Sequence, residues 1–186
     1  MATERTACIF WPVLALASFT LHFVWEYLQC AEFFVHQREP ATLGAMLRAT
    51  LGDLVLTVLA WAGTALATWD RRWALRRWTP RAWLALVVLA IALSVTIELH
   101  ALAMGWWFYT DRTPLLPLTP VSALPVLQLL LLFPLSFGLA RAFALRRTPL
   151  HLFIGHDVTV VSGSPLARAT QEPPSRALSC HSSEAR

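Results

Sequence analysis

Three acidic side chains, Glu26, Asp53 and Glu98, stand inside long apolar segments of this 186-residue chain. An ionisable group at bilayer depth costs about 2.5–3.5 kcal/mol on insertion scales, so it normally faces the interior of a helix bundle and has a partner there. Other polar side chains stand in segments of the same kind: His22, Gln29 and Gln128. Together these residue types can hydrogen-bond across helices, exchange protons or bind a cation.

Helical spacing places most of these residues on narrow stripes. Side chains at i, i+4, i+7 or i+8, and i+11 share one face of an α-helix. Three stripes follow this spacing: Ser18, His22, Glu26 and Gln29; Asp53, Thr57, Ala60 and Thr64; and Ser94, Glu98, Ala101 and Gly105. Each stripe predicts the face that its helix turns toward the other helices.

The elements that carry the stripes are four apolar segments, at about residues 8–31, 50–69, 82–104 and 121–140. A bilayer core about 30 Å thick needs roughly 20 apolar residues in a helix. Charged residues make up 14% of the chain, against about 25% in an ordinary globular domain. The sequence therefore predicts an all-α, four-helix transmembrane bundle in residues 1–147, followed by a mostly disordered tail in residues 148–186 that is rich in Pro and Ser.

Arginine placement predicts the orientation, because basic residues favour the cytoplasmic side. Three basic residues fall on one side of the predicted topology: Arg38, Arg48 and Arg112. Nine fall on the other: Arg5, Arg71, Arg72, Arg76, Arg77, Arg81, Arg141, Arg146 and Arg147. Both termini are therefore predicted to be cytoplasmic, in a bacterial inner membrane.

The net charge of +4 is carried by arginines beside apolar segments, which favours membrane lipids rather than nucleic acid as the partner. Four of these arginines are candidates for contact with lipid headgroups: Arg71, Arg72, Arg76 and Arg77. Four indoles flank them and are expected to form an interfacial aromatic belt: Trp69, Trp73, Trp78 and Trp83.

In this topology the buried polar residues all fall in the outer half of the membrane. They predict one outward-facing pocket, covered by an aromatic, proline-rich connection between residues 105 and 125. The expected pocket residues are Glu26, Gln29, Asp53, Glu98, Trp107, Tyr109 and Gln128.

Four functions remain open for this pocket. The polar groups could only specify helix packing, for instance through Glu98 with His22 or Gln128. They could bind a lipid-like ligand or a partner, the latter including a role as a chaperone or assembly factor. They could catalyse acid/base chemistry on an isoprenoid or lipid, with Glu26 or Glu98 as the acid and His22 as its partner. Finally, Glu26, Asp53 and Glu98 could hold a metal ion or carry protons in a transport element. The sequence predicts no cofactor, and it leaves open both the oligomeric state and whether the protein is an enzyme.

One motif carries a resemblance: Glu98-x-x-Ala101-x-x-x-Gly105-x-Trp107-x-Tyr109, followed by prolines and Leu124-Pro125-Val126-Leu127-Gln128. With the pairs Trp25-Glu26 and Gly52-Asp53, it resembles a small family of uncharacterised bacterial multi-pass membrane proteins. An acid that ends a helix before a Gly…Tyr segment is also similar to membrane proteins of carotenoid biosynthesis. The paired acids of a lycopene cyclase are absent from this segment, so the resemblance implies a membrane fold and no particular activity.

Overall fold

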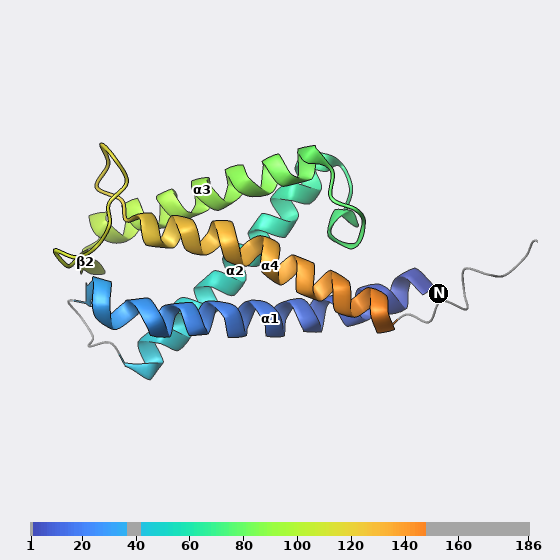
Figure 1. The fold of residues 1–186 in the computed structure, drawn as a ribbon, viewed down its shortest axis with the longest axis horizontal. Coiled ribbons are helices and arrows are strands. Elements are labelled where there is room, and N and C mark those ends of the chain that lie inside the picture. Colours follow the sequence, from blue (N-terminus) through green and yellow to red (C-terminus); the bar gives the residue numbers. More distant parts are fainter. Residues whose placement is uncertain (1, 37–41, 148–186) are drawn as a thin grey trace, which may run out of the picture. The chain divides into compact units, whose positions relative to one another are not determined.

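The computed structural model describes residues 2–36 and 42–147. Four long helices are present in this part: α1 (Ala2–Phe33), α2 (Leu43–Thr68), α3 (Pro80–Ala103) and α4 (Ala123–Arg147). Between them lie the short strands β1 (Phe34–His36) and β2 (Trp107–Tyr109) and the 3₁₀ turn η1 (Trp73–Leu75) (Figure 1). The tail predicted for residues 148–186 lies outside the described residues.

Each long helix contains a segment that is long and apolar enough to cross a membrane: Thr6–Gln29, Leu43–Thr68, Pro80–Ala103 and Ala123–Arg146. The shortest of these has 24 residues, which at 1.5 Å per residue extends about 36 Å, more than a bilayer core. The predicted all-α bundle of four membrane-length helices is confirmed. This is the architecture of a multi-pass membrane protein.

α1 (Ala2–Phe33) is longer than the predicted segment 8–31, and two other helices are longer than predicted too. α2 begins near residue 43 rather than 50, because Thr42 caps its N-terminus and accepts a hydrogen bond from the Ala45 amide at 3.2 Å. α4 continues to Arg147 rather than ending near residue 140. There Arg141 donates to the Leu75 carbonyl at 3.4 Å, which ties the polar end of α4 to η1. Hydropathy alone missed both extensions because the added turns contain arginine.

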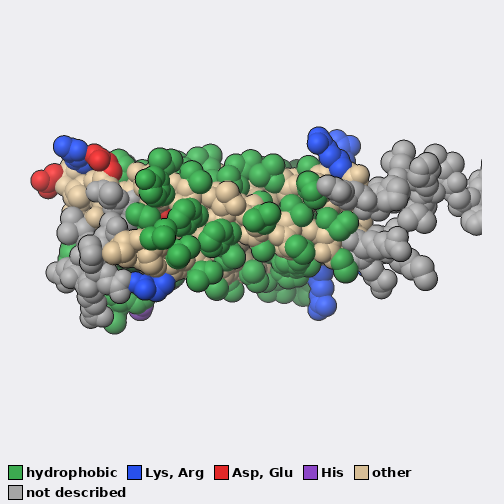
Figure 2. All heavy atoms as spheres, turned by 90° about the horizontal axis from the view of Figure 1, so that it is seen from below, with side chains coloured by type: hydrophobic (Ala, Val, Ile, Leu, Met, Phe, Trp, Pro, Cys, Tyr) green, Lys and Arg blue, Asp and Glu red, His purple; other side chains and the backbone are tan. Residues whose placement is uncertain are grey.

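The predicted stripes are the buried faces of their helices. Ser18 and Thr57, for example, are buried and share a hydrogen bond of 2.8 Å between α1 and α2. Small side chains such as Ala60, Ala90 and Ala140 let the backbones approach closely. Large apolar side chains instead point outward along every helix, as expected where lipid is the solvent (Figure 2).

One end of the bundle carries the basic connection, with arginine side chains beyond the hydrophobic surface (Figure 2). Arg76 pairs with Asp70 at 3.1 Å. The sequence predicted that Trp73 belongs to an interfacial belt. Instead, Trp73 is only 3% exposed and packs on Phe137 with ring centroids 5.1 Å apart. Its indole donates to the Trp61 carbonyl at 3.1 Å. Trp73 therefore closes the bundle, whereas Trp69 is 83% exposed.

The opposite end is closed by a strand pair that the sequence did not predict. β1 and β2 pair antiparallel, with Phe34 opposite Tyr109. The Thr113 hydroxyl donates to the Phe33 carbonyl at 2.7 Å, and Arg112 pairs with Glu32 at the same distance. The two connections at this end are thus joined, and they fix where the aromatic segment after α3 lies.

Candidate ligand-binding cavity

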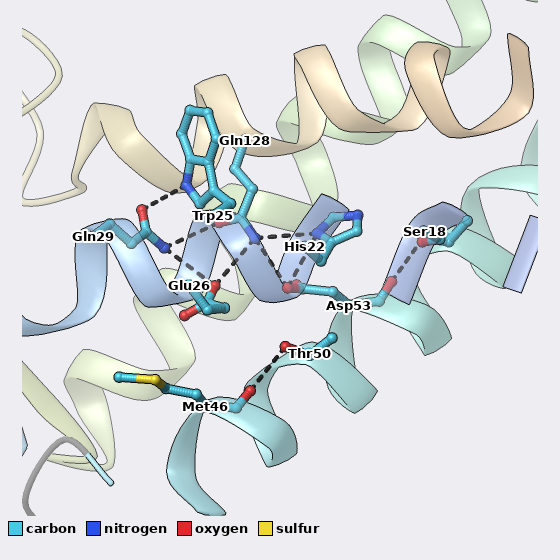
Figure 3. A network of polar contacts seen from close by, with 10 residues as sticks. Ser18, His22, Trp25, Glu26, Gln29, Met46, Thr50, Asp53 and Gln128 are labelled. Carbon is cyan, nitrogen blue, oxygen red and sulfur yellow. Dashed lines mark hydrogen bonds and ion pairs between the residues drawn. The ribbon is translucent and has the colours of Figure 1, made fainter. Parts of the chain in front are cut away.

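A network of polar side chains from three helices lies near the strand pair, and Gln128 of α4 is its centre (Figure 3). The Gln128 amide nitrogen lies 3.1 Å from Glu26 Oε1 on α1 and 3.0 Å from Asp53 Oδ2 on α2. Gln29 donates to the same Glu26 oxygen at 3.1 Å and to the Gln128 carbonyl at 3.2 Å. The Trp25 indole in turn donates to Gln29 at 2.7 Å. One buried amide thus bridges two carboxylates.

The number of hydrogens on each group limits which atoms in this network can donate and which must accept. An amide nitrogen has two hydrogens, and His22 Nδ1 lies 3.1 Å from Gln128 Nε2 and 3.2 Å from Asp53 Oδ2. If Gln128 donates to Glu26 and Asp53 while His22 Nδ1–H donates to Asp53, both carboxylates are satisfied, and the approach of His22 Nδ1 to Gln128 Nε2 is a contact between two donors. Asp53 then holds the imidazole in one orientation, and Gln128 holds the carboxylates apart.

His22 lies behind the carboxylates. It is fully buried and its ring faces Phe133, with centroids 6.2 Å apart. Its Nε2 atom has no hydrogen-bond partner among residues 2–36 and 42–147. The imidazole therefore supports Asp53 from within the bundle.

Glu98 belongs to a second polar group, formed by α3 and the segment that follows it. The Tyr109 hydroxyl donates to Glu98 Oε2 and accepts from the Ser122 amide at 3.0 Å. Burial, and then the bond to Glu98, raise the pKa of Tyr109 above its ordinary value, so the phenol remains a donor. Glu98 is therefore paired with Tyr109, and not with His22 or Gln128 as the packing hypothesis supposed.

Both polar groups border one cavity of about 520 Å³. Its lining comes from all four helices and from the strand pair: Glu26, Gln29, Phe34, Arg48, Ala49, Gly52, Asp53, Val55, Leu56, Leu59, Ser94, Ile97, Glu98, Trp106, Trp107, Pro125, Gln128 and Leu129. Three carboxyl groups and two amides gather in it, and most other lining side chains are apolar. This volume lies in the range of about 300–1,000 Å³ typical of small-molecule sites.

The cavity reaches the outer surface of the bundle between α2 and α3. These helices lie close together at their connection and separate toward the β2 end (Figure 1). Val55, Leu59 and Ile97 line the cavity and are also 59%, 48% and 38% exposed. A Cβ atom added at Gly52 would meet nothing within 4 Å. An apolar ligand could therefore reach the acids from the side of the bundle, between α2 and α3.

The structure brings six predicted pocket residues to this cavity: Glu26, Gln29, Asp53, Glu98, Trp107 and Gln128. Tyr109 acts on it through Glu98, and His22 through Asp53. Sequence reasoning named Trp25 only in the motif resemblance and did not expect it in the polar network, although it stands one helical turn before Gln29. Sequence reasoning also missed the outward-facing residues of α2. In a sequence, an apolar residue at the mouth of a cavity cannot be distinguished from one that faces lipid.

The residues predicted to hold a metal ion line this cavity, and those predicted to contact lipid headgroups lie at the basic end of the bundle. Among the described residues, no group of three or more His, Cys, Asp or Glu side chains could hold a metal ion. Arg71 and Arg72 line a cavity of about 130 Å³ at the basic end. Arg76 and Arg77 line a neighbouring one of about 380 Å³ beside Trp73.

The fold and the cavity define a class, a multi-pass membrane protein with a polar pocket inside its helix bundle. No protein-family model, curated protein or solved structure matches this chain.

Proposed function

We propose that this protein resides in the bacterial cytoplasmic membrane and binds a lipid-like molecule in the cavity between its helices. The polar end of the ligand would lie at Glu26, Asp53 and Glu98. The observation that supports this most strongly is the cavity itself, where three carboxyl groups border one space lined mainly by apolar side chains. A bundle that used these acids only for packing would be expected to close over them.

The side opening supports a ligand dissolved in the membrane. Val55, Leu59 and Ile97 stand at bilayer depth on α2 and α3, where they contact both the cavity and the surface of the bundle. Hydrocarbon is the solvent at that depth. An amphipathic molecule could place its head at the acids while its tail remained among lipids.

The arginine asymmetry supports an outward-facing cavity. The basic connection at the end opposite the strand pair is expected to contact anionic headgroups of the cytoplasmic leaflet through Arg71, Arg72, Arg76 and Arg77. The cavity would then belong to the outer leaflet. The motif resemblance to bacterial multi-pass membrane proteins supports the same membrane.

Acid/base chemistry on the bound lipid is a second candidate, favoured by the bond between Glu98 and Tyr109. A carboxyl and a phenol that share a hydrogen bond beside an apolar cavity can pass a proton to a ligand. Glu26 offers a second acid on the same cavity. His22 is less suited than predicted, because it is fully buried behind Asp53.

Lipid retention in mild detergent tests the proposal. Gly52→Phe would fill the cavity mouth without changing any acid, and Gly138→Phe is its matched control, since a Cβ there also meets nothing within 4 Å. Mass spectrometry of the purified proteins should find a lipid-like molecule with the wild type and with Gly138→Phe. Gly52→Phe should lose it. Equal retention by all three proteins would contradict the proposal.

A further inference from the structure

We propose that the headgroup bound in this cavity is an ammonium group, so that the ligand is an amphiphilic amine. This inference rests on the proposed function and names the chemical class of its ligand. Hydrogen-bond capacity, an unpartnered hydroxyl and local charge support it.

The amide donors of the polar network are already used within it. Gln29 gives its amide hydrogens to Glu26 and Gln128, and Gln128 gives its own to Glu26 and Asp53. Each carboxyl group has two oxygens with several acceptor sites. What these amides leave for a ligand is therefore the acceptor capacity of the carboxyl groups, which a donating headgroup complements.

Ser94 provides an independent observation. It lines the cavity from α3, one helical turn before Glu98, and it is 2% exposed. Its Oγ atom has no hydrogen-bond partner within the described part of the chain. A buried hydroxyl without a partner costs about 1–3 kcal/mol. A donor bound beside Glu98 would satisfy both Ser94 and the carboxylate.

The charge of the cavity lining also favours an ammonium group. Three acids border the cavity, while among its described lining residues Arg48 is the one basic side chain, so acids outnumber bases in the lining. A carboxyl group that ionises at bilayer depth is stabilised by a nearby cation. An ammonium group provides both the hydrogen-bond donor and the positive charge, because it has three N–H donors, a positive charge and no acceptor.

The apolar lining fits the rest of such a molecule. From the acids, the cavity leads past Leu56 to Val55, Leu59 and Ile97 on the outer surface. An alkyl chain attached to the ammonium group can follow this path into the membrane without desolvating any further polar group.

Three probes with the same C12 chain isolate the headgroup: dodecylamine, dodecanol and dodecanoic acid. We would measure their binding to the full chain by native mass spectrometry in mild detergent. Dodecylamine should bind at least about tenfold more tightly than either other probe, the difference expected from one hydrogen bond to a charged group. Glu98→Gln should lower its affinity by about tenfold on the same reasoning, and Ser94→Ala by a smaller factor. Asp111→Asn, an exposed acid outside the cavity, is the control and should leave binding unchanged.

The outcomes separate this inference from the proposed function. If dodecanol or dodecanoic acid binds as tightly as dodecylamine, and Gly52→Phe abolishes that binding, the amine assignment is wrong while the lipid-binding cavity stands. If no probe binds in a manner that depends on Gly52, both are wrong. If dodecylamine binds equally to the wild type, Ser94→Ala and Glu98→Gln, its headgroup does not contact these residues and the inference fails. Ser94→Ala keeps the test open if Glu98→Gln does not fold.

Discussion

Gln128 on α4 and Asp53 on α2 are joined by a hydrogen bond of 3.0 Å inside a segment built to cross a membrane. The same nitrogen serves Glu26 on α1 at 3.1 Å. One amide therefore holds three helices around the rear wall of the cavity and separates two acids that would otherwise repel each other.

Replacing Gln128 with Leu should destabilise the bundle, because both carboxylates lose a buried donor. We expect a loss of at least about 1–3 kcal/mol in the free energy of unfolding, measured by denaturant titration in detergent. Leu127→Ala is the control, since Leu127 is 47% exposed on the same helix. If the two variants unfolded at the same denaturant concentration, the network would contribute nothing to stability.

Tyr109 should ionise at a higher pH than an ordinary tyrosine. Burial raises its pKa above the ordinary value of about 10. The stability linked to this proton is fully present below pH about 10, where the phenol is protonated in both states, and it is lost as pH rises through the folded pKa. The chain has two tyrosines, so in a Tyr27→Phe background the phenolate absorbance reports Tyr109 alone. It should appear at higher pH in the folded than in the denatured protein, and coincident titrations would show that Tyr109 is not buried against Glu98.

Trp73 should matter for stability far more than Trp69. Truncating a buried Trp to Ala costs about 3–5 kcal/mol, and Trp73 is 3% exposed, whereas Trp69 is 83% exposed. Unfolding of Trp73→Ala and Trp69→Ala in detergent compares the two. Similar, small losses for both would support the interfacial belt that the sequence predicted.

Membrane orientation can be read from single cysteines in a cysteine-free background. Leu118→Cys replaces a fully exposed side chain in the connection after β2, and Arg77→Cys lies in the basic connection. A membrane-impermeant maleimide added to intact cells should label Leu118→Cys, and should label Arg77→Cys only after the membrane is opened. The reverse pattern would place the cavity in the cytoplasmic leaflet.

Much of the bundle could be predicted because lipid imposes simple constraints on a sequence. Uniform apolarity marked the four helices, and the stripe that includes His22 and Glu26 marked a buried face. Arginine also misled the prediction, since Arg48 and Arg141 stand on helical turns that hydropathy assigns to connections.

Pairing within the site could not be predicted from the sequence. Helical phase gives the face of a residue, but its partner depends on helix tilt and rotation. Thus Glu98 contacts Tyr109, eleven residues later in the chain, because the pairing of β1 with β2 brings this segment back over the bundle. The strands have three residues each, too few for a period-two pattern to be recognised.

The reactivity of a thiol at position 94 shows most directly whether the cavity connects the membrane to the acids. Ser94 and Ser136 are both at least 98% buried, but only Ser94 borders the cavity among the described lining residues. In a cysteine-free background, Ser94→Cys should react with a small membrane-soluble maleimide, and adding Gly52→Phe should stop the reaction, while Ser136→Cys should not react. If Ser94→Cys were as inert as Ser136→Cys, no space would connect the membrane to the acids, and a ligand cavity at this place would be wrong.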